Sequence, residues 1–298
     1  MGRHLVNSIA MAAVAVAQLG FSVPAFAQSG AAIEAARRVN ISGRQRMLSQ
    51  RISKAACFLN IGAETPGAPN ELADAVALFE TSLQALRRGN LDMGLGPERN
   101  PRIRNALVVV ADDWDAFSPH LQTALDSGFI ARPTLAALDA SGLQLLGDMN
   151  TAVNTTASAY GKALPDMPLI LSLTIDLAGR QRMFTQKAAK EFCLIEAGVD
   201  VAENRTRLAK TTELFTRTLG ALQSGMPGMV MAAPTAEISS QLTDIAAAWA
   251  GPKSALDAAA SGATLTPAQR AMIVDDMEQV LKMMNHAVSL YEAAVPPA

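Results

Sequence analysis

A short cationic segment that occurs twice holds the residues of this chain best suited to bind a small anion. The two copies are ISGRQRMLSQRISKAACFL from Ile41 and LAGRQRMFTQKAAKEFCLI from Leu177, at an offset of 136 residues. On a helix that turns about 100° per residue, Arg46 shares a small polar face with Gly43 and Gln50, away from the apolar residues. Planar guanidinium groups donate paired hydrogen bonds to neighbouring oxygens, so this face is suited to an oxyanion.

The second segment repeats this face. If the two helices pack face to face, Arg46 and Arg182 converge near a pseudo-two-fold axis, and glycine allows a close approach of the backbone. Two guanidiniums alone repel each other, whereas a bound monovalent oxyanion would reverse the repulsion. Pairing with surface acids would be preferred for a single arginine, but the duplication favours a ligand. The predicted ligand-binding residues are Arg46, Arg182, Gly43 and Gly179, with Arg51, Lys187, Gln50 and Gln186 in secondary positions.

The two cysteines of the chain, Cys57 and Cys193, stand at equivalent positions of the two segments. Each lies three helical turns beyond its arginine, on nearly the same face. In an oxidising compartment the pair could form a disulfide across the helix contact, and two buried free thiols are an equally good alternative. A redox or nucleophilic role is less expected, because no His/Asp pattern accompanies either cysteine.

The remaining chemical signals are weak. Met226, Met229 and Met231 could hold a soft metal, but adaptable apolar filler is the favoured interpretation. The sequence has no nucleophile elbow, phosphate loop, catalytic acid pair or zinc motif, so we expect no enzyme and no cofactor. A net charge of −2 argues against nucleic acid as a partner.

Amphipathic helices must position these residues. Aromatic residues make up 4% of the chain, and apolar residues recur at three- and four-residue spacing, which predicts an all-α protein. Four helices per copy with short connections predict two tandem up-down four-helix bundles, packed side by side as an intramolecular pseudo-dimer. The expected helices cover 31–62, 70–89, 102–126 and 133–163 in the first copy, and 168–197, 201–224, 235–259 and 266–293 in the second.

The first 27 residues have the pattern of a secretory signal peptide. Arg3 precedes a short apolar stretch, and Ala25-Phe26-Ala27 is a small-residue cleavage site. The stretch is shorter than the roughly 20 residues that span a bilayer, and no later segment is long and apolar enough to do so. We therefore expect a periplasmic protein cleaved after Ala27, with bundles over 28–164 and 168–298.

Both segments resemble the arginine-containing box of the PilJ/NarX-like sensor domain, found in type IV pilus chemoreceptors and nitrate/nitrite sensor kinases. The family's binding arginine lies three residues after a glycine and just before a methionine, a pattern that matches Arg46 and Arg182. The resemblance implies a periplasmic four-helix bundle that binds nitrate or nitrite at a dimer interface. It makes a small oxyanion, nitrate or nitrite, the expected ligand here.

Familiar members of that family also carry transmembrane helices and a cytoplasmic kinase or methyl-accepting module. Neither is found in this sequence, so we expect the signal to pass to a partner, a membrane receptor or a transporter. The alternative is a ligand-free helical interaction module that docks on an envelope receptor or a pilus or chemosensory complex. Retention of both arginines in the same register favours the ligand, and the missing transmembrane output favours the docking module.

Overall fold

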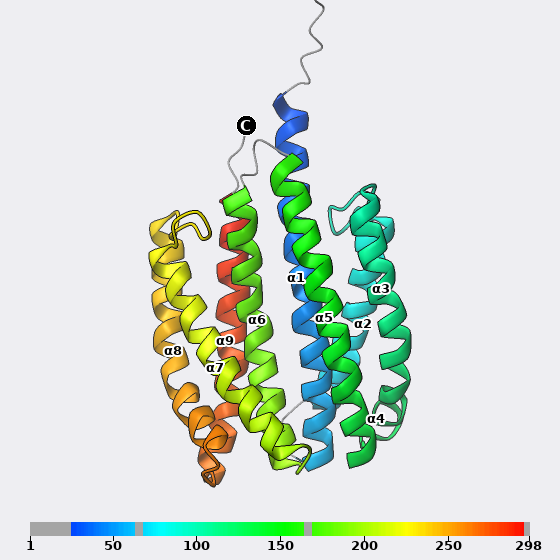
Figure 1. The fold of residues 1–298 in the computed structure, drawn as a ribbon, viewed down its shortest axis with the longest axis vertical. Helices are drawn as coiled ribbons and strands as arrows, with labels where there is room; N and C mark the ends of the chain where they lie inside the picture. The colour runs from blue at the N-terminus through cyan, green and yellow to red at the C-terminus, as the bar shows by residue number, and fades with distance from the viewer. Residues whose placement is uncertain (1–24, 63–67, 164–168, 295–298) are drawn as a thin grey trace, which may run out of the picture.

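A computed structural model describes residues 25–62, 68–163 and 169–294, and it confirms the all-α class (Figure 1). The first copy contributes α1 (Ala25–Ile61), α2 (Ala68–Arg88), α3 (Pro101–Phe117), α4 (Gln122–Ser127) and α5 (Arg132–Ala163). The second copy contributes α6 (Leu169–Glu196), α7 (Val201–Ser224), α8 (Ala236–Ala260) and α9 (Pro267–Ala293). No helix within the described ranges is long and apolar enough to cross a bilayer.

The third helix of the first copy differs from the prediction of one element over 102–126. It ends at Phe117, and a 3₁₀ turn over Ser118–Leu121 separates it from α4. The physical reason is Pro119, which has no backbone N–H to continue the α-helical hydrogen bonds. Gly128, in the left-handed region at φ 66°, then ends α4.

The first helices of the two copies, α1 and α6, form the most extensive contact between any two helices of the described chain. They run in the same direction through the middle of the molecule (Figure 1). In the first bundle α2 and α5 pack on α1, and α3 packs on α5. In the second, α7 and α9 pack on α6, and α8 packs on α7 and α9. This side-by-side arrangement agrees with the expected pseudo-dimer. The signal peptide, apart from its last three residues, and the joint at 164–168 lie outside the described residues, so the domain boundaries stay predictions.

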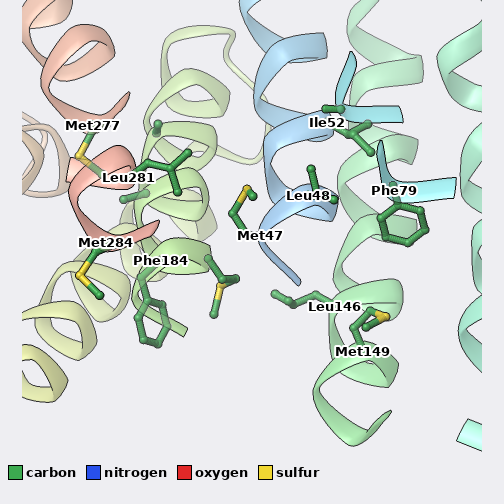
Figure 2. Close-up of a cluster of buried hydrophobic side chains, with 14 of the residues drawn as sticks. Met47, Leu48, Ile52, Phe79, Leu146, Met149, Phe184, Met277, Leu281 and Met284 are labelled. Carbon is green, nitrogen blue, oxygen red and sulfur yellow. The ribbon is translucent and has the colours of Figure 1, made fainter. Parts of the chain in front are cut away.

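Equivalent residues build the two bundle cores. Phe79 stacks on Trp114 with ring centroids 4.2 Å apart, and Phe215 packs on Trp249 at the same 4.2 Å. Methionines and leucines from the neighbouring helices fill the space between these clusters, as Figure 2 shows for the layer around Met47. Burial of these apolar side chains stabilises the fold at roughly 25 cal/mol per Å² removed from water.

Within the repeated segment, the glutamine that follows the first arginine has a structural role. Gln45 donates to the carbonyl oxygen of Phe79 at 3.0 Å, and Gln181 donates to that of Phe215 at 3.3 Å. Each bond joins the first helix of a bundle to its second. Part of the repeated motif therefore serves packing inside each bundle, whereas Arg46 and Arg182 reach across to the other bundle.

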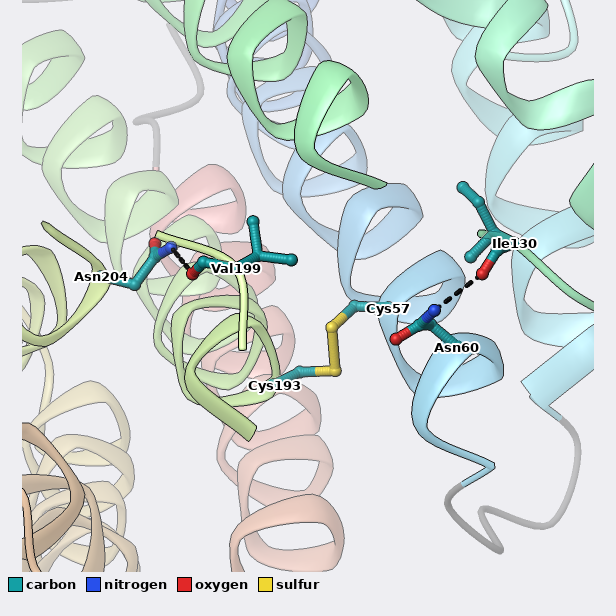
Figure 3. The surroundings of a disulfide bond; sticks show 6 residues. All are labelled: Cys57, Asn60, Ile130, Cys193, Val199 and Asn204. Carbon is teal, nitrogen blue, oxygen red and sulfur yellow. Dashed lines mark hydrogen bonds between the residues drawn. A yellow bond between two sulfur atoms is a disulfide. The ribbon is translucent and has the colours of Figure 1, made fainter. Parts of the chain in front are cut away.

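A disulfide and an ion pair join the bundles near the end of α1 and α6. Cys57 and Cys193 form a disulfide, with Cα atoms 6.1 Å apart (Figure 3). Lys54 of α1 pairs with Glu278 of α9. These ties hold α1 against α6 and α9, about two to three turns beyond the two central arginines.

Candidate functional site

Arg46 and Arg182 meet where α1 and α6 come close together at Gly43 and Gly179. A Cβ added to Gly43 would lie 3.4 Å from Nη2 of Arg46, 3.5 Å from Nη2 of Arg182 and 3.9 Å from the Cα atom of Gly179. Each arginine reaches across the contact: Arg46 donates to the carbonyl oxygen of Asp176, and Arg182 to that of Asn40. The two guanidiniums are therefore related by the pseudo-two-fold axis, and the absent Cβ atoms make room for them.

Arg46 has a carboxylate partner. Its Nη2 donates to Oδ1 of Asp176 at 2.6 Å, and its Nη1 donates to Oδ1 of Asn150 at 3.3 Å. The same carboxylate binds Arg180 through Oδ2 at 3.0 Å. Burial lowers the pKa of Arg46, and the Asp176 carboxylate acts against that shift. The expectation that an external ligand neutralises both arginines thus differs from the structure at Arg46, where Asp176 supplies the charge.

Arg182 has no such partner among the described residues. Its side chain is 3% exposed, and its hydrogen bond is to the Asn40 carbonyl oxygen at 3.1 Å. Burial, with Arg44 and Arg46 nearby, lowers the pKa of Arg182 to about 9, although Glu292 acts in the opposite direction. The Nε atom of Arg182 is buried without a hydrogen-bond partner in the described structure. This guanidinium is a buried cation that lacks an anion in contact.

A pocket of about 380 Å³ opens beside Arg182. Its cationic wall contains Arg44, Arg51 and Arg182, and its lining comes from α1, α2, α6 and α9. The polar lining also includes Asn40, Asn285, Ser289, Glu71 and Asp74, and the apolar lining consists of Met47, Leu48, Ala75 and Leu78. The pocket therefore borders the buried guanidinium and has room for a small polar solute.

The secondary positions predicted from the sequence have protein partners. Arg51 pairs with Glu71 at 3.0 Å and with Glu278 at 3.3 Å. Lys187 pairs with Glu191 and donates to Thr211. These two cations are thus already compensated, and a direct role for them in ligand binding stays a prediction.

The two predicted glutamines are buried at the same interface. Gln186 donates to Glu278 at 3.0 Å, and Gln50 donates to Ser49 at 3.3 Å. In the described structure both side-chain oxygens lack a hydrogen-bond donor. They line the contact between the bundles below the arginines, and the structure brings neither into the pocket beside Arg182.

The methionine cluster differs from the apolar filler that the sequence favoured. Met226 and Met229 are 41% and 60% exposed, whereas Met231 packs partly against the core. The described residues contain no group of three or more His, Cys, Asp or Glu side chains suited to a metal ion. The loop between α7 and α8 therefore presents these two methionines to solvent.

Sequence reasoning did not assign a role to the residue pair Asn40 and Asp176. They occupy equivalent positions at the offset of 136 residues, three before the box glycine, yet one is neutral and the other is anionic. Because of this difference, Arg46 is paired with a carboxylate of the chain itself, whereas Arg182 is not. A position-by-position alignment of the two copies contains that signal, because a charge changes next to an otherwise repeated motif.

The family model for the type IV pili methyl-accepting chemotaxis transducer N-terminal domain, PilJ, matches the chain twice, over residues 31–140 and 171–285. The chain therefore belongs to the PilJ family of chemosensory domains.

A curated relative agrees with that assignment. Methyl-accepting chemotaxis protein McpN of Pseudomonas aeruginosa is 29% identical over 116 residues, which make up 39% of this chain and 21% of that protein. This chain thus matches about a fifth of the length of that relative. The similarity supports a sensory class, and the activity of the whole relative does not transfer with it.

Proposed function

We propose that this protein is a periplasmic chemosensory receptor for a small oxyanion, nitrate or nitrite first, bound where α1 and α6 meet beside Arg46 and Arg182. One observation carries the proposal: Arg182 is buried and has no carboxylate in contact among the described residues. Desolvating a charge without a counter-ion costs several kcal/mol. A bound monovalent anion supplies the missing charge and removes that cost.

The chemistry of the pocket favours a small, singly charged ligand. Arg182 and Arg44 offer guanidinium donors, and Asn40 lies beside them. Glu71 and Asp74 also line this pocket and disfavour a doubly charged anion. Nitrate and nitrite are planar, carry one charge and present adjacent oxygens to a guanidinium. Both boxes resemble that of the PilJ/NarX-like family, which includes nitrate sensors, and this resemblance is a second, independent support.

The ties between the bundles favour movement of the helices at one end of the molecule when a ligand binds. At one end, the Cys57–Cys193 disulfide ties α1 to α6, and the Lys54–Glu278 pair ties α1 to α9. A change in the charge balance at Arg182 therefore moves the helices mainly at the other end, where α1 begins and α9 ends (Figure 1). A ligand that binds one packing more tightly shifts the population toward it. A membrane receptor or transporter would read the change there.

Docking without a ligand is the second candidate function. It is favoured by exposed apolar side chains on the loop that joins the second and third helices of each copy. Leu91 is 91% exposed, and Met229 is 60% exposed. Such side chains suit contact with an envelope receptor or a pilus complex.

Calorimetric titration of the purified protein with nitrate, nitrite, chloride and sulfate tests the proposal. The Arg46→Ala/Arg182→Ala double variant runs in parallel, and circular dichroism confirms that it is folded. Saturable nitrate or nitrite binding that the double variant lacks is the expected result. A folded wild-type protein that releases no heat with any of the four anions would contradict the receptor and favour the docking module.

A further inference from the structure

We infer that Asp176 is a built-in occupant of one of two pseudo-symmetric anion sites, and that the second site, between Arg44 and Arg182, takes an external planar, singly charged oxyanion. This inference rests on the proposed function and deepens it, because it assigns the ligand a position and a class. It also assigns Asp176 the role of a permanent internal ligand.

The Asp176 carboxylate shows which chemical group fits between the two arginines of the first site. Its Oδ1 accepts from Arg46 of α1 at 2.6 Å, and its Oδ2 accepts from Arg180 of α6 at 3.0 Å. The neutral side chains of two asparagines support the arginines: Oδ1 of Asn150 accepts from Arg46 at 3.3 Å, and Oδ1 of Asn154 accepts from Arg180 at 2.8 Å. A planar anion with two oxygens thus bridges two arginines from two different helices, and two asparagines of α5 fix the guanidiniums.

The pseudo-two-fold axis maps this cluster onto the pocket. The repeat offset relates Arg46 to Arg182, Arg180 to Arg44 and Asp176 to Asn40, and the slightly shorter offset of the last helix relates Asn150 to Asn285 and Asn154 to Ser289. All five counterparts, Asn40, Arg44, Arg182, Asn285 and Ser289, line the pocket of about 380 Å³. The structure therefore contains the same pair of arginines and the same polar supports on this side.

What differs is the carboxylate. Asn40 stands where Asp176 stands in the other copy, and its side-chain amide donates to Oε2 of Glu292 instead of contacting an arginine. Arg44 donates to the hydroxyl of Ser82 at 3.2 Å, and Arg182 donates to a backbone carbonyl. Two guanidiniums thus face the pocket without a carboxylate in contact in the described structure, and Glu292 compensates them only from a distance.

Two variants test the inference in opposite directions. Asn40→Asp combined with Glu292→Gln moves one negative charge from α9 to the position of the missing carboxylate, and it keeps the local net charge. This variant should occupy its own site, so its nitrate affinity should fall at least tenfold. Glu292→Gln alone is the matched control and should bind nitrate at least as tightly as the wild type.

Asp176→Ala opens the first site, between Arg46 and Arg180. Arg180 is 35% exposed beside the nearly buried Asp176, so a small anion can enter from solvent once the carboxylate is removed. Calorimetry with nitrate should then give two sites per chain instead of one. Formate and nitrate should also raise the melting temperature of this variant more than that of the wild type, and more than chloride or sulfate does.

The outcomes separate the two proposals. One nitrate per wild-type chain, lost in Asn40→Asp/Glu292→Gln, is the expected result. Unchanged nitrate binding by that folded variant would overturn the inference and leave the proposed function standing. If the variant does not fold, Asn285→Asp places a carboxylate in the pocket from α9 and carries the same expectation. A folded wild type that binds none of these anions would overturn both.

Discussion

Lys190 of α6 donates a hydrogen bond of 2.6 Å to Asp139 of α5, and this buried ion pair joins the two bundles. The equivalent lysine of the first copy, Lys54, crosses in the other direction to Glu278 of α9. Each first helix therefore sends its lysine to the last helix of the other bundle. Together with the disulfide, these reciprocal pairs explain why lysine and cysteine recur in both copies of the repeated segment.

Asp139→Asn should destabilise the protein. The substitution leaves Lys190, 1% exposed, without its carboxylate, and loss of one partner of a buried pair costs about 3 kcal/mol. Urea unfolding should report this loss in the free energy of unfolding. Asp92→Asn, an exposed change in the loop after α2, is the control and should stay within about 0.5 kcal/mol of the wild type.

Stability should fall in acid. Burial acts to raise the pKa of Asp139, but Lys190 and Arg207 outweigh it and lower that pKa below the ordinary 3.8. A carboxylate whose folded-state pKa is depressed stabilises the protein above its unfolded pKa, and the contribution is lost as pH falls through the folded value. The free energy of unfolding should therefore decline below about pH 4. Asp139→Asn should show a shallower decline, and an equal slope in both proteins would contradict the assignment.

Most of the fold could be predicted because the sequence repeats itself. Helix spacing of apolar residues and two copies of one motif predict two bundles, and α6 to α9 lie close to their expected ranges. The break at Pro119 was missed because the apolar spacing continues across it, from Phe117 to Leu121. Local backbone chemistry decided that element, and the hydrophobic pattern does not record it.

Removal of the disulfide should weaken the protein without abolishing its anion site. Cys57→Ser/Cys193→Ser opens a covalent loop of 136 residues. In the chain-entropy model, closure of a loop of this length contributes about 5 kcal/mol. Urea unfolding should show a loss of that order, whereas nitrate affinity should change less than threefold. Equal unfolding midpoints for the wild type and the double serine variant would show that the bond does not constrain the chain.

The contact between the two box glycines should tolerate a methyl group and reject a larger side chain. An added Cβ at Gly43 stays 3.4 Å or more from its nearest neighbours, so Gly43→Ala should remain within about 1 kcal/mol of the wild type. Gly43→Leu pushes into both guanidiniums and should cost about 1–3 kcal/mol through overpacking. Gly147→Leu is the control, because no atom lies within 4 Å of its Cβ position in α5.

The site was only partly predictable. The helical face of Arg46 and Arg182 placed both arginines at the interface, and the structure brings them together there. The carboxylate of Asp176 escaped prediction because its partner, Arg46, lies 130 positions away on another helix. Which residues line a pocket depends on the relative rotation of four helices, and no single-helix pattern contains that information.

Calorimetric titration of nitrate into Arg182→Ala beside Arg217→Ala tests the central claim most directly. Arg217 is a surface arginine, 65% exposed, so its loss removes the same charge far from α1. The Arg182 variant should lose at least about tenfold in affinity, the range of a charged hydrogen bond, while the Arg217 variant should match the wild type. Equal nitrate affinity in all three folded proteins would contradict an anion site at the interface of the two bundles.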